Sequence, residues 1–166
     1  HIGSEQLVYI QTDKVSLTIK GVVPADERNP AIGRHADPAS FKLFCNDCCE
    51  AIFYGNLTKY RLENGKQNYF EVHNGVPLFF EQRNYEIVIE AMVNEKISFW
   101  HDNYNIRNKV TSVGRNNRIL SGIINFGNEI GLSDFVIRFN DEEYLRLGIE
   151  VFPSKIDYQE DYQSIV

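Results

Sequence analysis

Hydrophobic and polar residues alternate along much of the chain, beginning close to its first residues. Leu17 and Ile19 are separated by Thr18 and flanked by other polar residues. This period of two is typical of a strand with one face buried and the other in solvent. Residues 5–11 and 14–23 are therefore predicted to be strands joined by a short polar turn, which makes an antiparallel hairpin.

Further segments rich in aromatic and β-branched residues follow at short intervals and are predicted to be strands. They cover residues 67–73, 78–81, 85–92, 97–101, 110–113, 119–126, 134–139 and 144–152. Asn64-Gly65 and Asn74-Gly75 are turn dipeptides, because Asn and Gly tolerate positive φ. Residues 24–38 are polar and predict a long loop, whereas residues 41–54 fit either a short helix or a strand.

These segments amount to about nine or ten short strands without intervening helices of 10–15 residues, a pattern that favours antiparallel pairing over a parallel βαβ sheet. We therefore expect a mainly β fold, an antiparallel β-sandwich or barrel-like domain, with a C-terminal helix starting near Asp157.

The expected helix follows from the pattern after residue 152. Pro153 has no backbone donor and ends the preceding strand-like run. Asp157 and Glu160 have the spacing of a capping box, and Tyr158 and Tyr162 share one helical face. Because helices shorter than about 12 residues are marginal in water, we expect this one to continue in a longer protein.

The chain thus divides into three expected parts. Residues 1–4 resemble a tag remnant left by cloning, residues 5–156 form a single β-rich domain, and residues 157–166 begin a helix that leads to a further C-terminal region. With 166 residues, 43% of them hydrophobic, the chain has the size and apolar content of one domain.

A net charge of −6 and a pI near 5.2 argue against non-specific binding to nucleic acid or to anionic membranes, which depends on an excess of Lys and Arg. No apolar run approaches the length of a membrane span, and no secretory leader is visible. We therefore expect no membrane partner.

Three cysteines, Cys45, Cys48 and Cys49, fall within five residues. An odd number does not suit a disulfide framework and favours a reducing cytoplasm. Cys45 and Cys48 have the spacing of zinc ligands, but the chain has no second cysteine pair to complete a site of four ligands. We expect these residues to be small side chains in a loop or at a strand edge, and we expect no metal site.

No motif for catalysis or cofactor binding is recognisable. The glycines between residues 114 and 131 lack the Gly-Lys-Ser/Thr ending of a phosphate-binding loop. Acidic residues 141–143 fall in a predicted hairpin turn, and Asp157 has a structural use as a helix cap. Glu150 and Lys155 are too far apart for the acid-x-lysine core of a metal-dependent nuclease. A free-standing enzyme that uses these carboxylates is the least favoured hypothesis.

Two segments are candidates for binding. In residues 122–135, Gly127 and Gly131 suggest a sharp reversal, and Asn125 can satisfy the amides of a turn. This segment is either a tight structural connection or a rigid loop presented to a partner.

The second candidate is residues 103–118, in which Arg107, Lys109, Arg115 and Arg118 are interleaved with five asparagines. Arg and Asn can contact phosphates and base edges. This segment is either a DNA-binding surface or a solvated loop.

Three longer motifs are similar to a known bacterial family. They are Pro77-Leu-Phe-Phe-Glu81-Gln-Arg-Asn-Tyr85, Gly122-Ile-Ile-Asn-Phe-Gly127 with Gly131-Leu-Ser-Asp-Phe135, and Glu150-Val-Phe-Pro-Ser-Lys155-Ile-Asp-Tyr-Gln-Glu-Asp-Tyr162. Together they resemble the domain of unknown function that precedes a PD-(D/E)XK nuclease domain in McrC-like proteins of McrBC-type restriction systems. The resemblance covers residues 78–166.

The resemblance implies a role in defence against foreign DNA, beside an AAA+ GTPase of the McrB type, with the nuclease residues located after residue 166. This chain would be a non-catalytic interaction and regulatory module that has no cofactor of its own. The residues expected to bind the partner are Asn125, Gly127, Gly131, Ser154, Lys155 and Asp157. The alternative is a DNA-binding module that uses Arg107, Lys109, Arg115 and Arg118.

Overall fold

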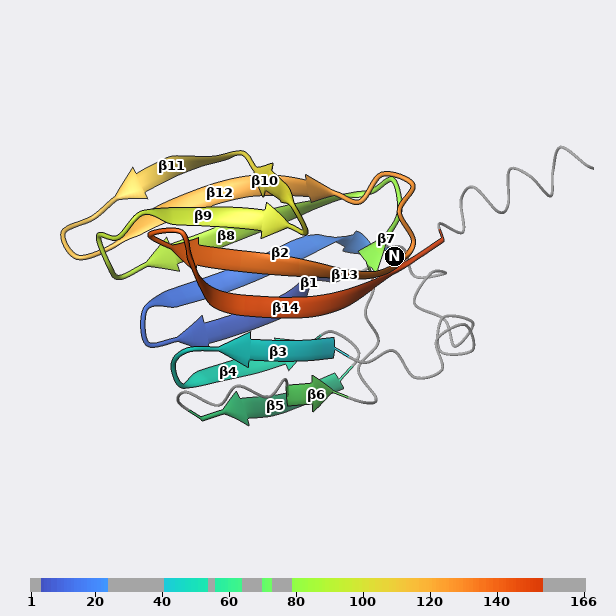
Figure 1. The fold of residues 1–166 in the computed structure, drawn as a ribbon, viewed down its shortest axis with the longest axis horizontal. Coiled ribbons are helices and arrows are strands. Elements are labelled where there is room, and N and C mark those ends of the chain that lie inside the picture. The colour runs from blue at the N-terminus through green and yellow to red at the C-terminus, as the bar shows by residue number, and fades with distance from the viewer. Residues whose placement is uncertain (1–3, 24–40, 54–55, 64–69, 73–78, 154–166) are drawn as a thin grey trace, which may run out of the picture.

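The computed structural model describes residues 4–23, 41–53, 56–63, 70–72 and 79–153. These residues form fourteen β-strands and no helix, arranged in two sheets that lie face to face (Figure 1). The mainly β, antiparallel fold expected from the sequence is therefore confirmed in its described part, as a sandwich. No described segment is a helix of the length and apolar character that crossing a membrane requires.

Sheet 1 has seven strands in the order β11-β12-β8-β2-β1-β4-β5, and all its neighbouring strands are antiparallel. They are β1 (Ser4–Thr12), β2 (Val15–Val23), β4 (Cys49–Phe53), β5 (Asn56–Leu62), β8 (Asn84–Ala91), β11 (Asn108–Val113) and β12 (Arg118–Asn125).

Sheet 2 has the order β10-β9-β13-β14-β3-β6, again antiparallel, and β7 adds to β14 as a short parallel neighbour. Its strands are β3 (Phe41–Cys45), β6 (Phe70–Val72), β7 (Phe79–Phe80), β9 (Ile97–His101), β10 (Tyr104–Ile106), β13 (Gly131–Phe139) and β14 (Glu142–Phe152).

The alternation of residue types explains which face of each strand is buried. In β8, Tyr85, Ile87 and Ile89 are no more than 1% exposed, whereas Glu86 and Glu90 lie on the opposite face. The buried side chains of both sheets form one hydrophobic cluster. Burying a side chain of this size stabilises the fold by about 1.5–3 kcal/mol relative to leaving it exposed, so this shared core holds the two sheets together.

The chain crosses repeatedly between the sheets. Five connections whose residues are all described change sheet: those between β3 and β4, β7 and β8, β8 and β9, β10 and β11, and β12 and β13. The polar segments between strands therefore gather at the two ends of the sandwich, where side chains distant in sequence can meet.

Most strands in the described residues follow the sequence pattern. The first hairpin is confirmed, with Tyr9 opposite Thr18, and Thr12 accepts hydrogen bonds from the amides of Lys14 and Val15 in its turn. The β13–β14 hairpin is likewise confirmed. Ser4, assigned to a tag remnant from the sequence, lies in β1 opposite Val23.

Two expectations are resolved or corrected by the structure. Residues 41–54, which fitted helix or strand, contain β3 and β4, and these strands belong to different sheets. Residues 103–118, for which a solvated loop was one alternative, contain β10 and all of β11, and β11 includes the predicted strand at 110–113. Ile106 packs into the core, and β11 pairs with β12. The first segment was ambiguous because its apolar residues fit either element, and the second because most of its residues are polar.

Other expectations fall outside the described residues. These are the loop at residues 24–38, the turns at Asn64-Gly65 and Asn74-Gly75, and the C-terminal helix starting near Asp157.

The hydroxyl of buried Tyr85 accepts a hydrogen bond from the backbone amide of Phe80 at 2.6 Å. Replacing Tyr85 by Phe would leave that amide without this acceptor, so we expect Tyr85→Phe to lower the free energy of unfolding by about 1–3 kcal/mol. Urea denaturation measures the change. Tyr104→Phe is the matched control, because Tyr104 is 64% exposed. Equal stability of both variants would contradict a structural role for this hydroxyl.

Candidate functional site

Three of the residues expected to bind a partner lie together in the connection between β12 and β13, here called the docking loop (residues 125–131). Asn125 ends β12 and Gly131 begins β13. Gly127 and Gly131 have φ values of +58° and +103°, in the left-handed region that favours glycine. The sharp reversal expected from the sequence is present. Ser154, Lys155 and Asp157 lie outside the described residues.

Hydrogen bonds fix the docking loop to the neighbouring connection between β7 and β8. The side-chain oxygen of Asn125 accepts from the amide of Gly127 at 2.7 Å, and its nitrogen donates to Asn84 Oδ1 at 2.9 Å. The backbone amide of Gln82 donates to the carbonyl oxygen of Gly127 at 2.7 Å, and its side chain donates to Asn128 Oδ1 at 2.5 Å. Two connections thus support each other at one end of the sandwich.

The three motifs that carry the family resemblance meet at this end. Phe79 and Phe80 of β7 pair in parallel with Val151 and Phe152 of β14, and Gly131 of β13 also pairs with Val151. The described residues of the three motifs therefore form one contiguous region of the fold, although the motifs are up to about seventy positions apart in sequence.

An aromatic cluster lies beneath the docking loop. Phe126 is 2% exposed, and its ring centroid is 5.9 Å from those of Phe79 and Tyr85. The imidazole of His101 meets the ring of Phe126 edge-on at 4.9 Å. Packing of this kind stabilises each aromatic pair by about 0.5–1.5 kcal/mol beyond area burial, so the base of the loop is fixed.

The outer side of this region presents apolar side chains to solvent. Ile130 in the docking loop is 57% exposed, and Leu132, at the start of β13, is 81% exposed. Glu150 lies opposite Leu132 on β14, and partial burial raises the pKa of its carboxyl group. Two large apolar side chains next to a rigid turn are suited to contact with another protein.

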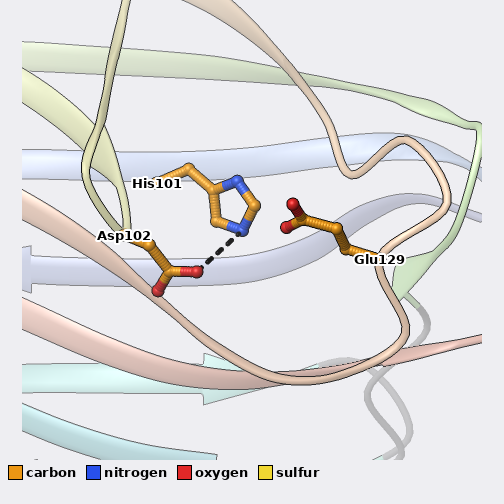
Figure 2. A group of neighbouring side chains, drawn as sticks. All are labelled: His101, Asp102 and Glu129. Atoms are coloured by element: carbon orange, nitrogen blue, oxygen red, sulfur yellow. Dashed lines mark ion pairs between the residues drawn. The ribbon is translucent and has the colours of Figure 1, made fainter.

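His101, Asp102 and Glu129 approach one another beside the docking loop (Figure 2). His101 ends β9 and is 8% exposed, and its Nε2 lies 3.8 Å from Asp102 Oδ2. Asp102 is in the turn after β9, with a φ of +50°, and Glu129 projects from the docking loop. One ligand atom from each residue lies within 4.8 Å of the others.

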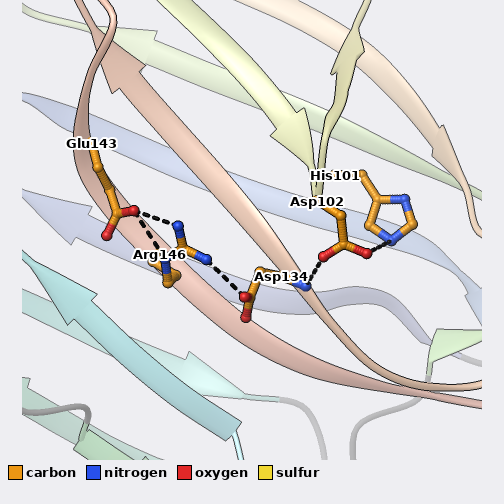
Figure 3. Close-up of polar contacts among 5 residues, drawn as sticks. All are labelled: His101, Asp102, Asp134, Glu143 and Arg146. Atoms are coloured by element: carbon orange, nitrogen blue, oxygen red, sulfur yellow. Dashed lines mark hydrogen bonds and ion pairs between the residues drawn. The ribbon is translucent and has the colours of Figure 1, made fainter.

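Asp102 is held in place by the neighbouring strand (Figure 3). Its backbone amide donates to the carbonyl oxygen of Asp134, and its Oδ1 accepts from the amide of Asp134, both at 2.9 Å. The Asp134 carboxylate is paired with Arg146 at 2.7 Å, and Arg146 also contacts Glu143 at 2.5 Å. This network spreads from the sandwich end over the outer face of sheet 2.

Burial raises the pKa of the Asp134 carboxyl group, and the negative charge of Asp102 adds to the effect. Burial also raises the pKa of Glu143, while Arg138 opposes that shift. Both carboxylates are thus partly removed from water, and the cation of Arg146 lies between them.

Two of the four basic residues proposed for DNA binding line a groove on the outer side of sheet 1. Arg107 and Lys109 lie there with exposed Tyr104 and Ile123, around a space of about 680 Å³. Glu86, on the same groove, is paired with Lys20 at 3.1 Å. The groove therefore combines two cations and an aromatic ring with one neutralised acid.

The other two basic residues are placed differently. Arg115 lies in the turn between β11 and β12, at the far end of this hairpin. The guanidinium of Arg118 donates to the carbonyl oxygen of Glu95, which gives this side chain a structural role. The structure does not bring the four residues into one cluster.

Two of the three cysteines belong to the hydrophobic core, and Cys48 is half-buried. Cys45 and Cys49 are buried, on β3 and β4 of opposite sheets. The Cys49 side chain donates a hydrogen bond to Cys45, which lowers the pKa of Cys45 and raises that of Cys49. Cys45 and Cys49 thus lie in strands rather than in a loop, whereas Cys48 lies in the connection between β3 and β4.

The cluster of His101, Asp102 and Glu129 was missed by the sequence reasoning. Its signal is weak, because His101 and Asp102 simply end a strand, and Glu129 stands between two glycines of a turn. The pairing of β13 with β9 brings these positions together, because Phe135 lies opposite His101 and the docking loop leads into β13.

Comparisons with known proteins add one match. A family model described as Domain of unknown function (DUF2357) matches residues 121–166. The matched segment includes the docking loop and the β13–β14 hairpin. The comparisons with curated proteins and with solved structures found no match.

The positive φ of Gly127 allows a test of whether the reversal in the docking loop depends on left-handed backbone geometry. An added Cβ at Gly127 would meet no atom within 4 Å, so only backbone strain opposes a side chain there. We expect Gly127→Val to lower the free energy of unfolding by about 1–2 kcal/mol, and Gly127→Asn to cost clearly less, because Asn tolerates this conformation. Urea denaturation of both variants compares them. Identical losses would show that the reversal does not depend on left-handed geometry.

Proposed function

We propose that this chain is the non-catalytic N-terminal interaction and regulatory module of a McrC-like restriction endonuclease subunit. In this proposal it docks, in the cytoplasm, on an AAA+ GTPase of the McrB type that acts in defence against foreign DNA. The PD-(D/E)XK nuclease domain would follow it in the same protein. The proposal extends the resemblance of the three sequence motifs, and its activity and partner rest on that resemblance.

One structural observation supports docking. The three motifs converge on a single end of the sandwich, around a loop whose backbone is held by Gln82, Asn84 and Asn125. Positions that are buried within the motifs, such as Phe79 and Phe126, build this end. Positions that are exposed, Ile130 and Leu132, project from it.

Docking through this end is energetically reasonable. Covering an exposed side chain such as Leu132 contributes about 1.5–3 kcal/mol when it becomes fully buried. A loop that is already fixed loses little conformational freedom on binding, which preserves more of that free energy as affinity. The acidic balance of the chain also favours a protein partner over the DNA backbone.

Replacing Leu132 by Asp would place a charge at the centre of the proposed contact. We expect Leu132→Asp to weaken binding to the AAA+ protein encoded beside this chain by at least about tenfold, as for a hot-spot residue, and to reduce any effect on its GTP hydrolysis. A pull-down and a GTPase assay measure these changes.

Val113→Asp is the control for this experiment, because Val113 is 76% exposed and lies at the opposite end of the β11–β12 hairpin from the docking loop. Normal binding by Leu132→Asp, or a wild-type chain that neither binds the AAA+ protein nor changes its GTP hydrolysis, would count against docking.

The groove beside β11 favours a second candidate function, DNA binding. Arg107 and Lys109 can contact phosphates, and exposed Tyr104 can stack on a base. Such a surface would bind DNA weakly, because the net charge of the chain is −6.

For this second candidate, the double variant Arg107→Ala/Lys109→Ala should weaken DNA binding and reduce the slope of log affinity against log salt by about one for each phosphate contact removed. Gel-shift titration across salt concentrations measures both. Lys96→Ala is the control, since the Lys96 side chain is 69% exposed and pairs with Asp141 in a different region. Absence of any shift at low salt would exclude DNA binding.

A further inference from the structure

The imidazole of His101 is in an unusual environment for a buried polar group. Its Nε2 is buried and has no hydrogen-bond partner among the described residues. The nearest acidic oxygen, Asp102 Oδ2, is 3.8 Å away, beyond hydrogen-bonding distance. Leaving a buried polar nitrogen without a hydrogen bond costs about 1–3 kcal/mol. A bound ligand that satisfies this nitrogen would remove that cost.

The unsatisfied nitrogen faces two carboxylates. Figure 2 shows Nε2 directed toward Asp102, with the Glu129 carboxylate on the other side. The side chain of His101 is 10% exposed, so the nitrogen lies at the inner end of the cluster while the carboxylates reach it from the solvent side. One nitrogen and two carboxylate oxygens converging within 4.8 Å form a set of potential metal ligands.

We propose that His101, Asp102 and Glu129 bind a divalent transition-metal ion of the zinc class. The imidazole nitrogen selects this class, because Ca²⁺ and Mg²⁺ prefer sites made of oxygen ligands. This site is distinct from the docking function proposed above and does not depend on the identity of the partner.

The geometry requires only a small closure. Zinc bonds to nitrogen and oxygen ligands are about 2.0–2.2 Å long, so tetrahedral ligands lie about 3.4 Å apart. Nε2 and Asp102 Oδ2, at 3.8 Å, are already near that separation. Glu129 is exposed and can approach by rotating its side chain.

Neighbouring groups hold two of the three proposed ligands in a fixed orientation, as is usual around metal sites. Asp102 is fixed because its Oδ1 accepts from the amide of Asp134 at 2.9 Å, which leaves Oδ2 free to turn toward the ion. The ring of His101 is fixed edge-on against Phe126. Two ligands are therefore preorganised by sheet 2 and the core, and the third comes from the docking loop.

A metal ion at this position would join two connections at the same end of the sandwich. It would link the turn after β9 to the docking loop through Glu129, and it would leave a fourth coordination position for water or for a ligand from another molecule. Binding of the ion would thus add a further link that holds the docking loop against sheet 2.

The test is a titration of the chelator-treated whole chain with zinc, in which isothermal titration calorimetry measures the binding. We expect one zinc ion per chain at this site. Glu129→Gln and Asp102→Asn should each weaken binding at least tenfold. Asn retains an oxygen acceptor for the Asp134 amide and tolerates the φ of +50°, so Asp102→Asn should fold. Glu142→Gln, at the exposed first residue of β14, is the matched control.

Cobalt distinguishes this site from the cysteines. Co²⁺ bound to nitrogen and oxygen should show no sulfur-to-metal charge-transfer band, whereas ligation by Cys45, Cys48 or Cys49 would produce one. In NMR spectra, zinc should shift the ring protons of His101 and the amide of Glu129. Absence of zinc binding, equal binding by Glu129→Gln and the wild-type chain, or a thiolate band at the first equivalent of cobalt would overturn the proposal. If Asp102→Asn fails to fold, Glu129→Gln decides the outcome.

Discussion

The shared hydrophobic core between the two sheets is the constraint on which the rest of the structure depends. Residues such as Leu17 and Ile87 from sheet 1 pack in the same cluster as Phe99 and Phe135 from sheet 2. Because the chain contributes to both layers in alternation, it must cross between them at the ends of the sandwich. The candidate site is one such crossing, and its shape follows from the strands that enter and leave it.

This arrangement separates a rigid base from a variable surface. Buried aromatic residues and paired polar side chains hold the backbone of the docking loop, while Ile130, Leu132 and Glu129 remain accessible. The base is determined by packing, so substitutions there act on stability. The accessible side chains are not needed for packing or for the backbone hydrogen bonds of the loop. They are therefore available for interaction with a partner or an ion.

The sequence was informative where residue type follows burial. The alternation of Leu17, Thr18 and Ile19 revealed a strand, and Gly127 and Gly131 indicated the reversal that their positive φ values allow. It was less informative at the sheet edge, where all six residues of β11 are exposed and only residues 110–113 were predicted to be a strand. The approach of His101 to Glu129 depends on pairing between distant segments, and no local pattern encodes that pairing.

The short parallel pairing of β7 with β14 has a mechanical consequence. Phe79 and Phe80 hydrogen-bond along the end of β14, and β13 pairs with the same strand over most of its length. A force applied at Phe152 along the axis of β14 would load these ladders in shear, so many hydrogen bonds would resist it together. Strain arriving from that direction would therefore be passed to the sandwich as a whole instead of peeling away its last strand.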